Sequence, residues 1–330
     1  MHCRDEPNRP YRRFLGRGRG LSVAAVGALG VALVGAAGLP AAGPGPGPAS
    51  ALAAPSGRFP HPSKVAVLAL ENKSFGQVIG NRKAPYLNHL ARQNALATRY
   101  YAVSHPSLPN YVALTGGSTG EITRNCTSCD TSGQNLVGQL DKAGVSWKAY
   151  FEGLTSNTRP GAVTSTYNPH YNPFVYHDSV TRSASARARI IGFNRLHRDL
   201  RLGRLPRFSW IAPGVRHDGH NGSLRQSDRY ASRLVPKVLH ALGPHGVLYL
   251  TWDEGARKDT RGVNGVKGGG RVALIAAGGA ARKGATSAVP ANHYALLRTI
   301  EANFALPALA HAGASSTPLL AGLLKPSPSP

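Results

Sequence analysis

The stretch Lys64-Val65-Ala66-Val67-Leu68-Ala69-Leu70 is a nearly continuous apolar run of the length of a β-strand. Runs of this kind fill the interior of parallel sheets, because such strands are covered on both faces. The run ends abruptly in the polar pair Glu71-Asn72. In open α/β sheets, binding sites lie beyond the carboxyl ends of the strands. The stretch therefore predicts a buried central strand with a polar site at its end.

The same pattern returns at Val247-Leu248-Tyr249-Leu250-Thr251, which is soon followed by Asp253-Glu254. Shorter strand-like segments alternate with segments of helical periodicity along the rest of the chain, which contains no internal repeat. This alternation predicts an α/β fold with a doubly wound, largely parallel sheet and helices on both faces. We expect a single domain over residues 64–324, a linker at 54–63 and a disordered tail at 325–330.

The N-terminal segment has the layout of an export signal. Residues 4–19 are basic, residues 21–39 are apolar and small, and Ala51-Leu52-Ala53 supplies a cleavage site. We therefore expect residues 1–53 to be a cleavable signal peptide and the mature protein to be secreted or located in the cell envelope. The run Arg12-Arg13-Phe14-Leu15 is compatible with the twin-arginine route, although the usual spacer before the phenylalanine is missing.

The chain is strongly basic. After residue 53 there remain 33 of the 39 Lys and Arg residues and 13 of the 15 Asp and Glu residues, a net charge near +20. This charge favours phosphorylated small molecules, phospholipids or an anionic cell surface as partners, and a basic surface with no particular partner is the alternative. No basic run with interleaved aromatics and no zinc-finger or helix-turn-helix signature is present. Sequence-specific binding to nucleic acid is therefore not expected.

Cys126 and Cys129 are the only cysteines after residue 53. In an exported protein, a C-x-x-C pair predicts a local disulfide that fastens a loop. A redox motif would call for a strand-to-helix turn, which the flanking residues do not suggest. A zinc site would need two more soft ligands, which the chain lacks.

Ser107 follows the turn His105-Pro106 and precedes the apolar run Tyr111-Val112-Ala113-Leu114, which has helical character. A serine at this point is a natural N-cap, and a helix N-terminus attracts anions through its free N–H groups and its dipole. A hydroxyl nucleophile and an anion cradle would then coincide. An ordinary capping serine is the alternative, and the acids and histidines elsewhere in the chain decide between the two.

Acids and histidines follow three of the predicted strands and begin one predicted helix. They divide into two sets of candidate metal ligands, namely Glu71, Asp253 and Glu254 with Ser107, and Asp218 and His220 with His293. Carboxylate and imidazole groups suit divalent ions such as Zn, Mn, Mg, Ca or Fe. Two metals would clamp a phosphorus centre, and a single metal on the first set is the simpler alternative. Each element taken alone is also explained as a polar turn or a helix start.

Metal coordination would turn the hydroxyl of Ser107 into a competent nucleophile, since a serine hydroxyl is weak at neutral pH. Phosphoryl transfer needs positioning and charge neutralisation above all, which metals, helix N–H groups and Asn110 would supply.

Five motifs in order resemble the phosphoesterase family, which contains bacterial phospholipases C and acid phosphatases within the alkaline-phosphatase-like superfamily. They are E-N-K-S-F at 71–75, H-P-S-L-P-N-Y at 105–111, H-D-G-H at 217–220, T-W-D-E-G at 251–255 and N-H-Y-A-L-L-R-T-I-E at 292–301. The resemblance covers about residues 64–324. Tyr111 replaces the arginine of the longer phospholipase-like members, which favours the shorter phosphatase-like branch.

The resemblance implies a role for each matching residue. Ser107 would be the nucleophile, and Asn110 would lie near the phosphoryl oxygens. The metal ligands would be Glu71, Asn72, Asp253, Glu254, Asp218, His220 and His293. His105 and, less clearly, His170 would contact the substrate or the leaving group; an additional Tyr171 interrupts the family's motif beside His170.

The sequence thus supports the hypothesis of a secreted phosphoesterase of the acid-phosphatase type that depends on one or two divalent metal ions. It would hydrolyse phosphate esters through a phosphoserine on Ser107. One alternative is a phospholipase C that uses the same site on diester lipids, with aromatic residues of the segment 154–187 contacting the acyl chains. Another is a non-catalytic cationic protein that binds polyanions or cell-wall polymers.

Overall fold

The central strand of the sheet is β1 (Lys64–Leu70), which pairs in parallel with β5 on one side and with β6 on the other. The computed structural model describes residues 59–326, and the nine strands within them form one sheet in the order β4-β3-β5-β1-β6-β7-β2-β8, with β9 also paired to β2. The other strands are β2 (Ala95–Tyr101), β3 (Trp147–Phe151), β4 (Ile190–Gly192), β5 (Phe208–Ala212), β6 (Gly246–Trp252), β7 (Arg271–Ala277), β8 (Thr286–Ser287) and β9 (Ala291–Asn292).

The sheet is largely parallel, as the sequence predicts. Strand β7 alone runs antiparallel to its neighbours β6 and β2 within the described part of the chain. The predicted central strands are buried along almost their whole length, since every residue of β6 and all but the first residue of β1 are inaccessible. Burial on both faces explains why these segments are apolar throughout and do not alternate.

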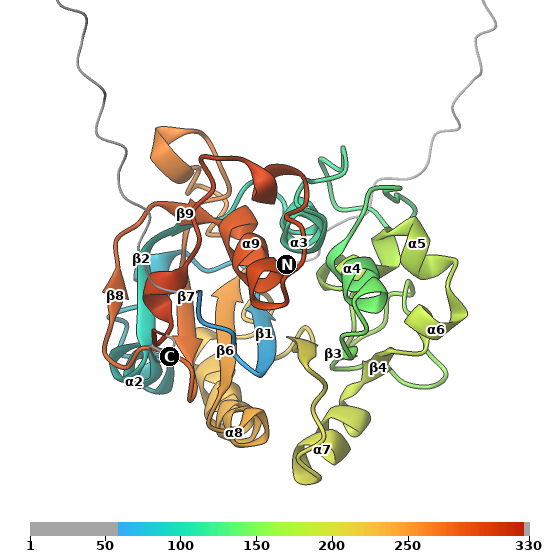
Figure 1. Ribbon diagram of the computed structural model, residues 1–330, viewed down its shortest axis with the longest axis horizontal. Coiled ribbons are helices and arrows are strands. Elements are labelled where there is room, and N and C mark those ends of the chain that lie inside the picture. Colours follow the sequence, from blue (N-terminus) through green and yellow to red (C-terminus); the bar gives the residue numbers. More distant parts are fainter. Residues whose placement is uncertain (1–58, 327–330) are drawn as a thin grey trace, which may run out of the picture. The chain divides into compact units, whose positions relative to one another are not determined.

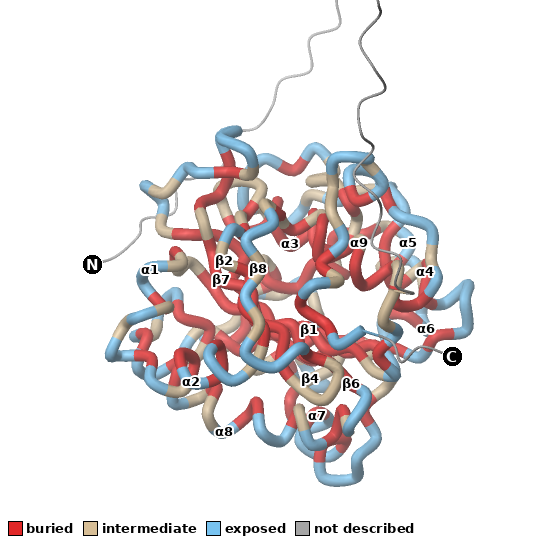
Figure 2. The backbone as a smooth tube through the Cα atoms, turned by 60° about the vertical axis from the view of Figure 1, so that its left-hand side comes forward, coloured by how far each residue is buried: buried red, intermediate tan, exposed pale blue. Residues whose placement is uncertain are grey.

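Helices cover both faces of the sheet (Figure 2). On one face, α3 packs against α9 and α4; on the other, α8 packs against α2, α7 and the strands β1 and β6 (Figure 1). The helices are α1 (Phe75–Val78), α2 (Pro85–Gln93), α3 (Ser107–Gly116), α4 (Leu136–Lys142), α5 (Asp178–Thr181), α6 (Ala184–Arg187), α7 (Phe193–Arg201), α8 (Leu224–Leu242) and α9 (His293–Asn303). The predicted doubly wound α/β architecture is confirmed.

The irregular segment 154–187 folds back onto the core. Its two 3₁₀ turns, Pro169–Tyr171 and Pro173–Tyr176, contact α3. Its aromatic side chains Tyr167, Tyr171, Phe174 and Tyr176 are all buried. These rings are therefore part of the packing under the segment and do not form an exposed apolar surface.

The predicted signal peptide, residues 54–58 of the predicted linker and residues 327–330 of the predicted tail lie outside the described residues. No helix between residues 59 and 326 is long and apolar enough to cross a membrane.

Candidate active site

The order of the strands brings three of the predicted polar clusters to one edge of the sheet. Because β5, β1 and β6 are parallel neighbours, the residues that follow them meet beyond their carboxyl ends. The backbone holds these chain segments together, since the N–H of Glu71 donates to the carbonyl of Asp218 at 2.9 Å. The N–H of Asp253 likewise donates to the carbonyl of Leu70 at 2.9 Å.

Ser107 lies at the same edge, on the first turn of α3. The structure corrects the expectation that it caps the helix: Pro106 occupies the N-cap position and Ser107 is the first helical residue. Its hydroxyl is consequently free of a capping bond and donates to Glu254 Oε1 at 3.2 Å and to Glu71 Oε2 at 3.4 Å. Ser107 therefore presents a buried hydroxyl between two carboxylates at the start of a helix.

Asn72 links the two acidic segments. Its backbone is in the left-handed region, with φ of 48°, and its N–H donates to Asp253 Oδ1 at 2.9 Å. Its side-chain amide donates to Glu254 Oε1. Two oxygens of this cluster, Asn72 Oδ1 and Asp253 Oδ2, are buried without a hydrogen-bond partner. Buried oxygens without partners are costly, so this cluster is built to receive a further donor or a cation.

The electrostatics of the acids lead to the same conclusion. Burial, and then the neighbouring charges of Asp253 and Asp218, raise the pKa of Glu71 well above its ordinary value. Burial and the charge of Glu254 raise the pKa of Asp253 in the same direction. Carboxylates crowded into a buried site resist ionisation together unless a positive charge joins them.

Part of the first predicted ligand set meets around Ser107, whose hydroxyl lies within hydrogen-bond reach of Glu71 and Glu254. No group of three or more His, Cys, Asp or Glu side chains within residues 59–326 is by itself arranged to hold a metal ion. Around Ser107, however, the serine hydroxyl contacts carboxylate oxygens of Glu71 and Glu254, and the side-chain amide of Asn72 contacts the same oxygen of Glu254. Oxygen donors of this kind fit a hard divalent cation.

The second predicted set does not converge. His293, the first residue of α9, is buried with both ring nitrogens engaged: Nδ1 with the hydroxyl of Tyr100 at 2.9 Å and Nε2 with the carbonyl of Asp253 at 2.5 Å. His220 is exposed and its Nδ1 contacts Asn221 Oδ1 at 2.7 Å. Asp218 is buried and accepts the backbone N–H of His220 at 2.8 Å. His293 therefore contacts the carbonyl of Asp253, while His220 lies near enough to Asp218 to lower the pKa of that carboxyl against the larger, raising effect of burial.

His105 and Asn110 support the turn before Ser107. The ring of His105 lies between Glu254 Oε2 and the carbonyl of Asp259, and the hydrogen bond with Glu254 raises the pKa of the imidazole. Asn110 is fully buried; its Oδ1 accepts the N–H groups of Val103 and Ser104 at 2.9 and 3.0 Å. Its amide donates to the carbonyls of Ser104 and Pro106, so Asn110 fixes the turn and its side chain is fully occupied.

His170 lies on the 3₁₀ turn Pro169–Tyr171 and does not contact these residues through any hydrogen bond in the described part of the chain. Burial lowers the pKa of its imidazole, and its Nε2 is buried without a partner.

Two residues at the site carry no assigned role in the sequence analysis. The hydroxyl of Tyr111 donates to Glu71 Oε1 at 2.7 Å, so it orients the carboxylate that also accepts from Ser107. The ammonium of Lys73 donates to the carbonyl of Gly219. Burial lowers its pKa, and the nearby charges of Asp218, Asp253 and Glu71 oppose this effect in part. The only sequence signal for either residue is membership in the quoted motifs, where Tyr111 departs from the family pattern and Lys73 is the third residue of E-N-K-S-F.

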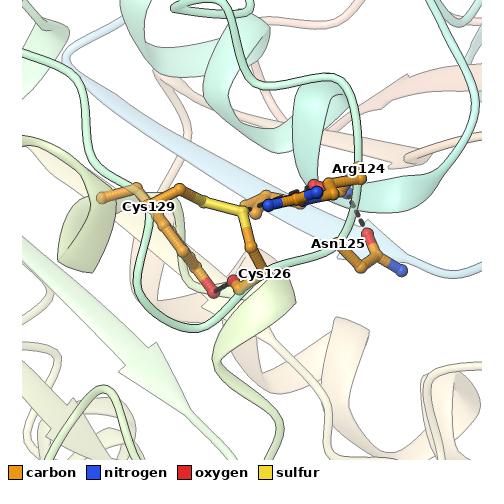
Figure 3. The surroundings of a disulfide bond; sticks show 6 residues. Arg124, Asn125, Cys126 and Cys129 are labelled. Carbon is orange, nitrogen blue, oxygen red and sulfur yellow. Dashed lines mark hydrogen bonds between the residues drawn. A yellow bond between two sulfur atoms is a disulfide. The ribbon is translucent and has the colours of Figure 1, made fainter. Parts of the chain in front are cut away.

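The predicted disulfide between Cys126 and Cys129 is present in the structure, in the loop beside the start of α3 (Figure 3).

Comparison with known proteins identifies the family. The family model described as the phosphoesterase family matches residues 80–307. A phosphatidylinositol-3-phosphatase of Mycobacterium tuberculosis is 29% identical over 75% of this chain and 79% of the relative. A probable acid phosphatase of Kluyveromyces lactis is 27% identical over 74% of this chain, and a phosphate-repressible acid phosphatase of Penicillium chrysogenum is 29% identical over 68%. The chain spans only 58% and 55% of the lengths of these two relatives.

Solved structures confirm the fold. A protein of the alkaline phosphatase superfamily from Vibrio parahaemolyticus superposes with a TM-score of 0.53, at 14% identity, over 76% of this chain and 68% of that one. The lipoteichoic acid synthase LtaP of Listeria monocytogenes gives a TM-score of 0.52 at 9% identity, over 77% and 75% of the two chains. The match of the family model to residues 80–307 confirms the resemblance found in the sequence motifs: this chain belongs to the phosphoesterase family and is a hydrolase that acts on phosphoric ester bonds.

Proposed function

We propose that this protein is a metal-dependent phosphatase that hydrolyses phosphate monoesters through a phosphoserine on Ser107. The observation that carries the proposal is the position of the Ser107 hydroxyl, which lies on the first turn of α3 within hydrogen-bond reach of both Glu71 and Glu254. The names of the relatives, all phosphatases, agree with this activity.

Glu71, Asn72, Asp253 and Glu254 would hold the metal, because they supply the converging oxygens and two of those oxygens have no other partner. When bound, a divalent cation would favour ionisation of the Ser107 hydroxyl and offset the negative charge of the substrate phosphoryl group. Tyr111 would keep Glu71 oriented toward the site, and His105 would do the same for Glu254.

The chemistry would run in two displacements. In the first, the Ser107 hydroxyl releases its proton as Oγ forms a bond to phosphorus, the bond between phosphorus and the leaving oxygen breaks, and the leaving oxygen gains one proton in exchange. In the second, water attacks the phosphoserine, phosphate leaves and the serine is regenerated. The N-terminus of α3 favours the anionic phosphoryl group throughout, since its N–H groups and dipole carry positive charge.

We propose a monoester substrate and not a lipid diester for two reasons. The four aromatic rings of the segment 154–187 are buried, so they do not offer the acyl-binding surface that a phospholipase C would need. Tyr111 also occupies the position of the arginine found in phospholipase-like members, and its hydroxyl is committed to Glu71.

Export and a role at the cell surface belong to the same proposal. A cleaved signal at residues 1–53 would deliver the enzyme to an oxidising compartment, where a disulfide such as Cys126–Cys129 persists. The net charge near +20 after residue 53 would favour electrostatic association with an anionic envelope.

The test is the hydrolysis of an aryl phosphate monoester and the matched diester by purified protein, with and without a chelator. We expect monoester turnover that exceeds diester turnover and that disappears on metal removal. Preferred diester turnover would favour the phospholipase alternative. A salt-sensitive affinity for polyanions without any turnover would instead indicate the non-catalytic binder.

A further inference from the structure

Helix α3 begins without a capping side chain of its own. Its N-cap is Pro106, which makes no side-chain hydrogen bond, although the first N–H groups of a helix have no partner within the helix. The N–H of Leu108, which directly follows Ser107, nevertheless has a partner. It donates to Asn125 Oδ1 at 3.0 Å, across 17 positions of the sequence (Figure 3).

The disulfide ring holds Asn125 in place. Cys126, the next residue, is bonded to Cys129, and its carbonyl accepts the hydroxyl of the buried Tyr176 at 2.8 Å. Both cysteines pack against an apolar cluster formed by Leu108, Val112, Ile122 and Tyr176. Two of these four residues belong to α3, so the disulfide loop and the helix of Ser107 share one small core.

Asn125 itself is exposed, and the only hydrogen bond of its side chain within residues 59–326 is the one to Leu108. An exposed loop residue would ordinarily be free to adopt several side-chain conformations, at an entropic cost for fixing one. Here the bonds on either side of Cys126 restrict the backbone that carries it. The loop therefore supplies in advance the cap that Pro106 cannot provide.

From this geometry we propose that Asn125, fastened by the Cys126–Cys129 ring, is a positioning residue for the nucleophile. It would act by fixing the first turn of α3, and hence the direction of the Ser107 hydroxyl toward Glu71 and Glu254. The inference rests on the proposed role of Ser107. It assigns the disulfide a role in catalysis, through the position of Asn125, in addition to its contribution to stability.

The test compares kcat/KM for an aryl phosphate in Asn125→Ala and in Asn125→Asp, using the full metal-loaded enzyme. Asn125→Ala should lower kcat/KM about fivefold to tenfold, the size expected when a helix cap is lost at a reacting group. Asn125→Asp keeps an acceptor oxygen at the same place and should stay within about twofold of the wild type. Asn157→Ala removes another exposed asparagine, whose side chain is bonded only to Ser156 among residues 59–326; it is the control and should change nothing.

A second arm removes the ring. The double substitution Cys126→Ser with Cys129→Ser should lower kcat/KM by a similar factor, and adding Asn125→Ala should cause little further loss, because both changes act on one contact. The inference would be overturned if the cysteine substitutions and Asn125→Ala lowered kcat/KM independently, so that their factors multiplied in the combined variant. An unchanged kcat/KM in Asn125→Ala would also overturn it.

Failure of the proposed function is visible separately. If the wild type has no turnover, or if Ser107→Ala retains full activity, the proposed function is wrong whatever Asn125 does. If the wild type and Ser107→Ala behave as proposed while Asn125→Ala matches the wild type, only the positioning role is wrong.

Discussion

Ser107 Oγ lies 3.2 Å from Glu254 Oε1, although 147 positions separate the two residues in the sequence. The contact exists because Ser107 is the first residue of α3 and Glu254 follows the end of β6. Both residues lie at the same edge of the sheet. It joins the proposed nucleophile to the proposed metal ligands. The following predictions derive from this contact and from the groups around it.

Metal content should be one equivalent per chain. In the part of the chain that the structure describes, Glu71 and Glu254 both reach Ser107, whereas both nitrogens of His293 are engaged and His220 Nδ1 contacts Asn221. Elemental analysis of protein purified without chelator should therefore give one divalent ion. Asp253→Asn should weaken metal affinity by at least about tenfold, while His220→Ala should leave the metal content unchanged. Two equivalents, with one of them lost in His220→Ala, would contradict this arrangement.

Tyr111→Phe should weaken the site without dismantling it. The substitution removes the 2.7 Å hydrogen bond to Glu71 and leaves the ring packing intact, at a cost of about 1 to 2 kcal/mol. We expect metal affinity, measured by titration calorimetry, to fall about tenfold. Tyr101→Phe, on a tyrosine for which no side-chain hydrogen bond is found in the described residues, should have no effect. Equal affinities in Tyr111→Phe and the wild type would show that Glu71 does not need this contact.

Glu301, near the C-terminal end of α9, should make the free energy of unfolding depend on pH. Burial raises its pKa from 4.5 to about 8; Oε1 accepts the N–H of Leu309 at 3.0 Å, and Oε2 has no partner. Because the folded state keeps a proton that the unfolded chain releases, this contribution to stability is complete below about pH 4.5 and is lost as the pH rises toward 8.

Glu301→Gln, which keeps an oxygen for Leu309, should accordingly be more stable than the wild type at pH 8 by about 4 kcal/mol. At pH 4.5 the two proteins should differ little. Urea denaturation at both pH values measures the difference, and an equal stability difference at both values would refute the assignment.

The sequence was a good guide to the fold because its central strands are buried on both faces. Apolar runs such as 64–70 and 246–252 leave few alternatives, and their polar ends mark the edge where the site forms. The antiparallel direction of β7 was not predictable in this way, since a buried strand has the same apolar pattern in either direction.

The site was predictable in its members but not in its contacts. Strand ends pointed to Glu71, Asp253 and Glu254, and the structure brings them together with Ser107. Asn110 and His293 were expected at the phosphoryl group and the metal, yet their polar atoms are taken up by backbone and tyrosine partners. Hydrogen bonds to backbone groups depend on the fold, so a pattern of residues in the sequence does not predict them. The capping of Leu108 by Asn125 is of the same kind.

The most direct test of the central claim is to quench the metal-loaded enzyme with acid during turnover of an aryl phosphate and to locate covalently bound phosphate by peptide mass spectrometry. We predict one phosphoryl group on Ser107 in the wild type and none in Ser107→Ala, whose turnover should fall at least about a thousandfold. Ser232→Ala, on α8, is the matched control and should behave as the wild type. Full turnover by Ser107→Ala, or hydrolysis without any phosphate on Ser107, would contradict the account.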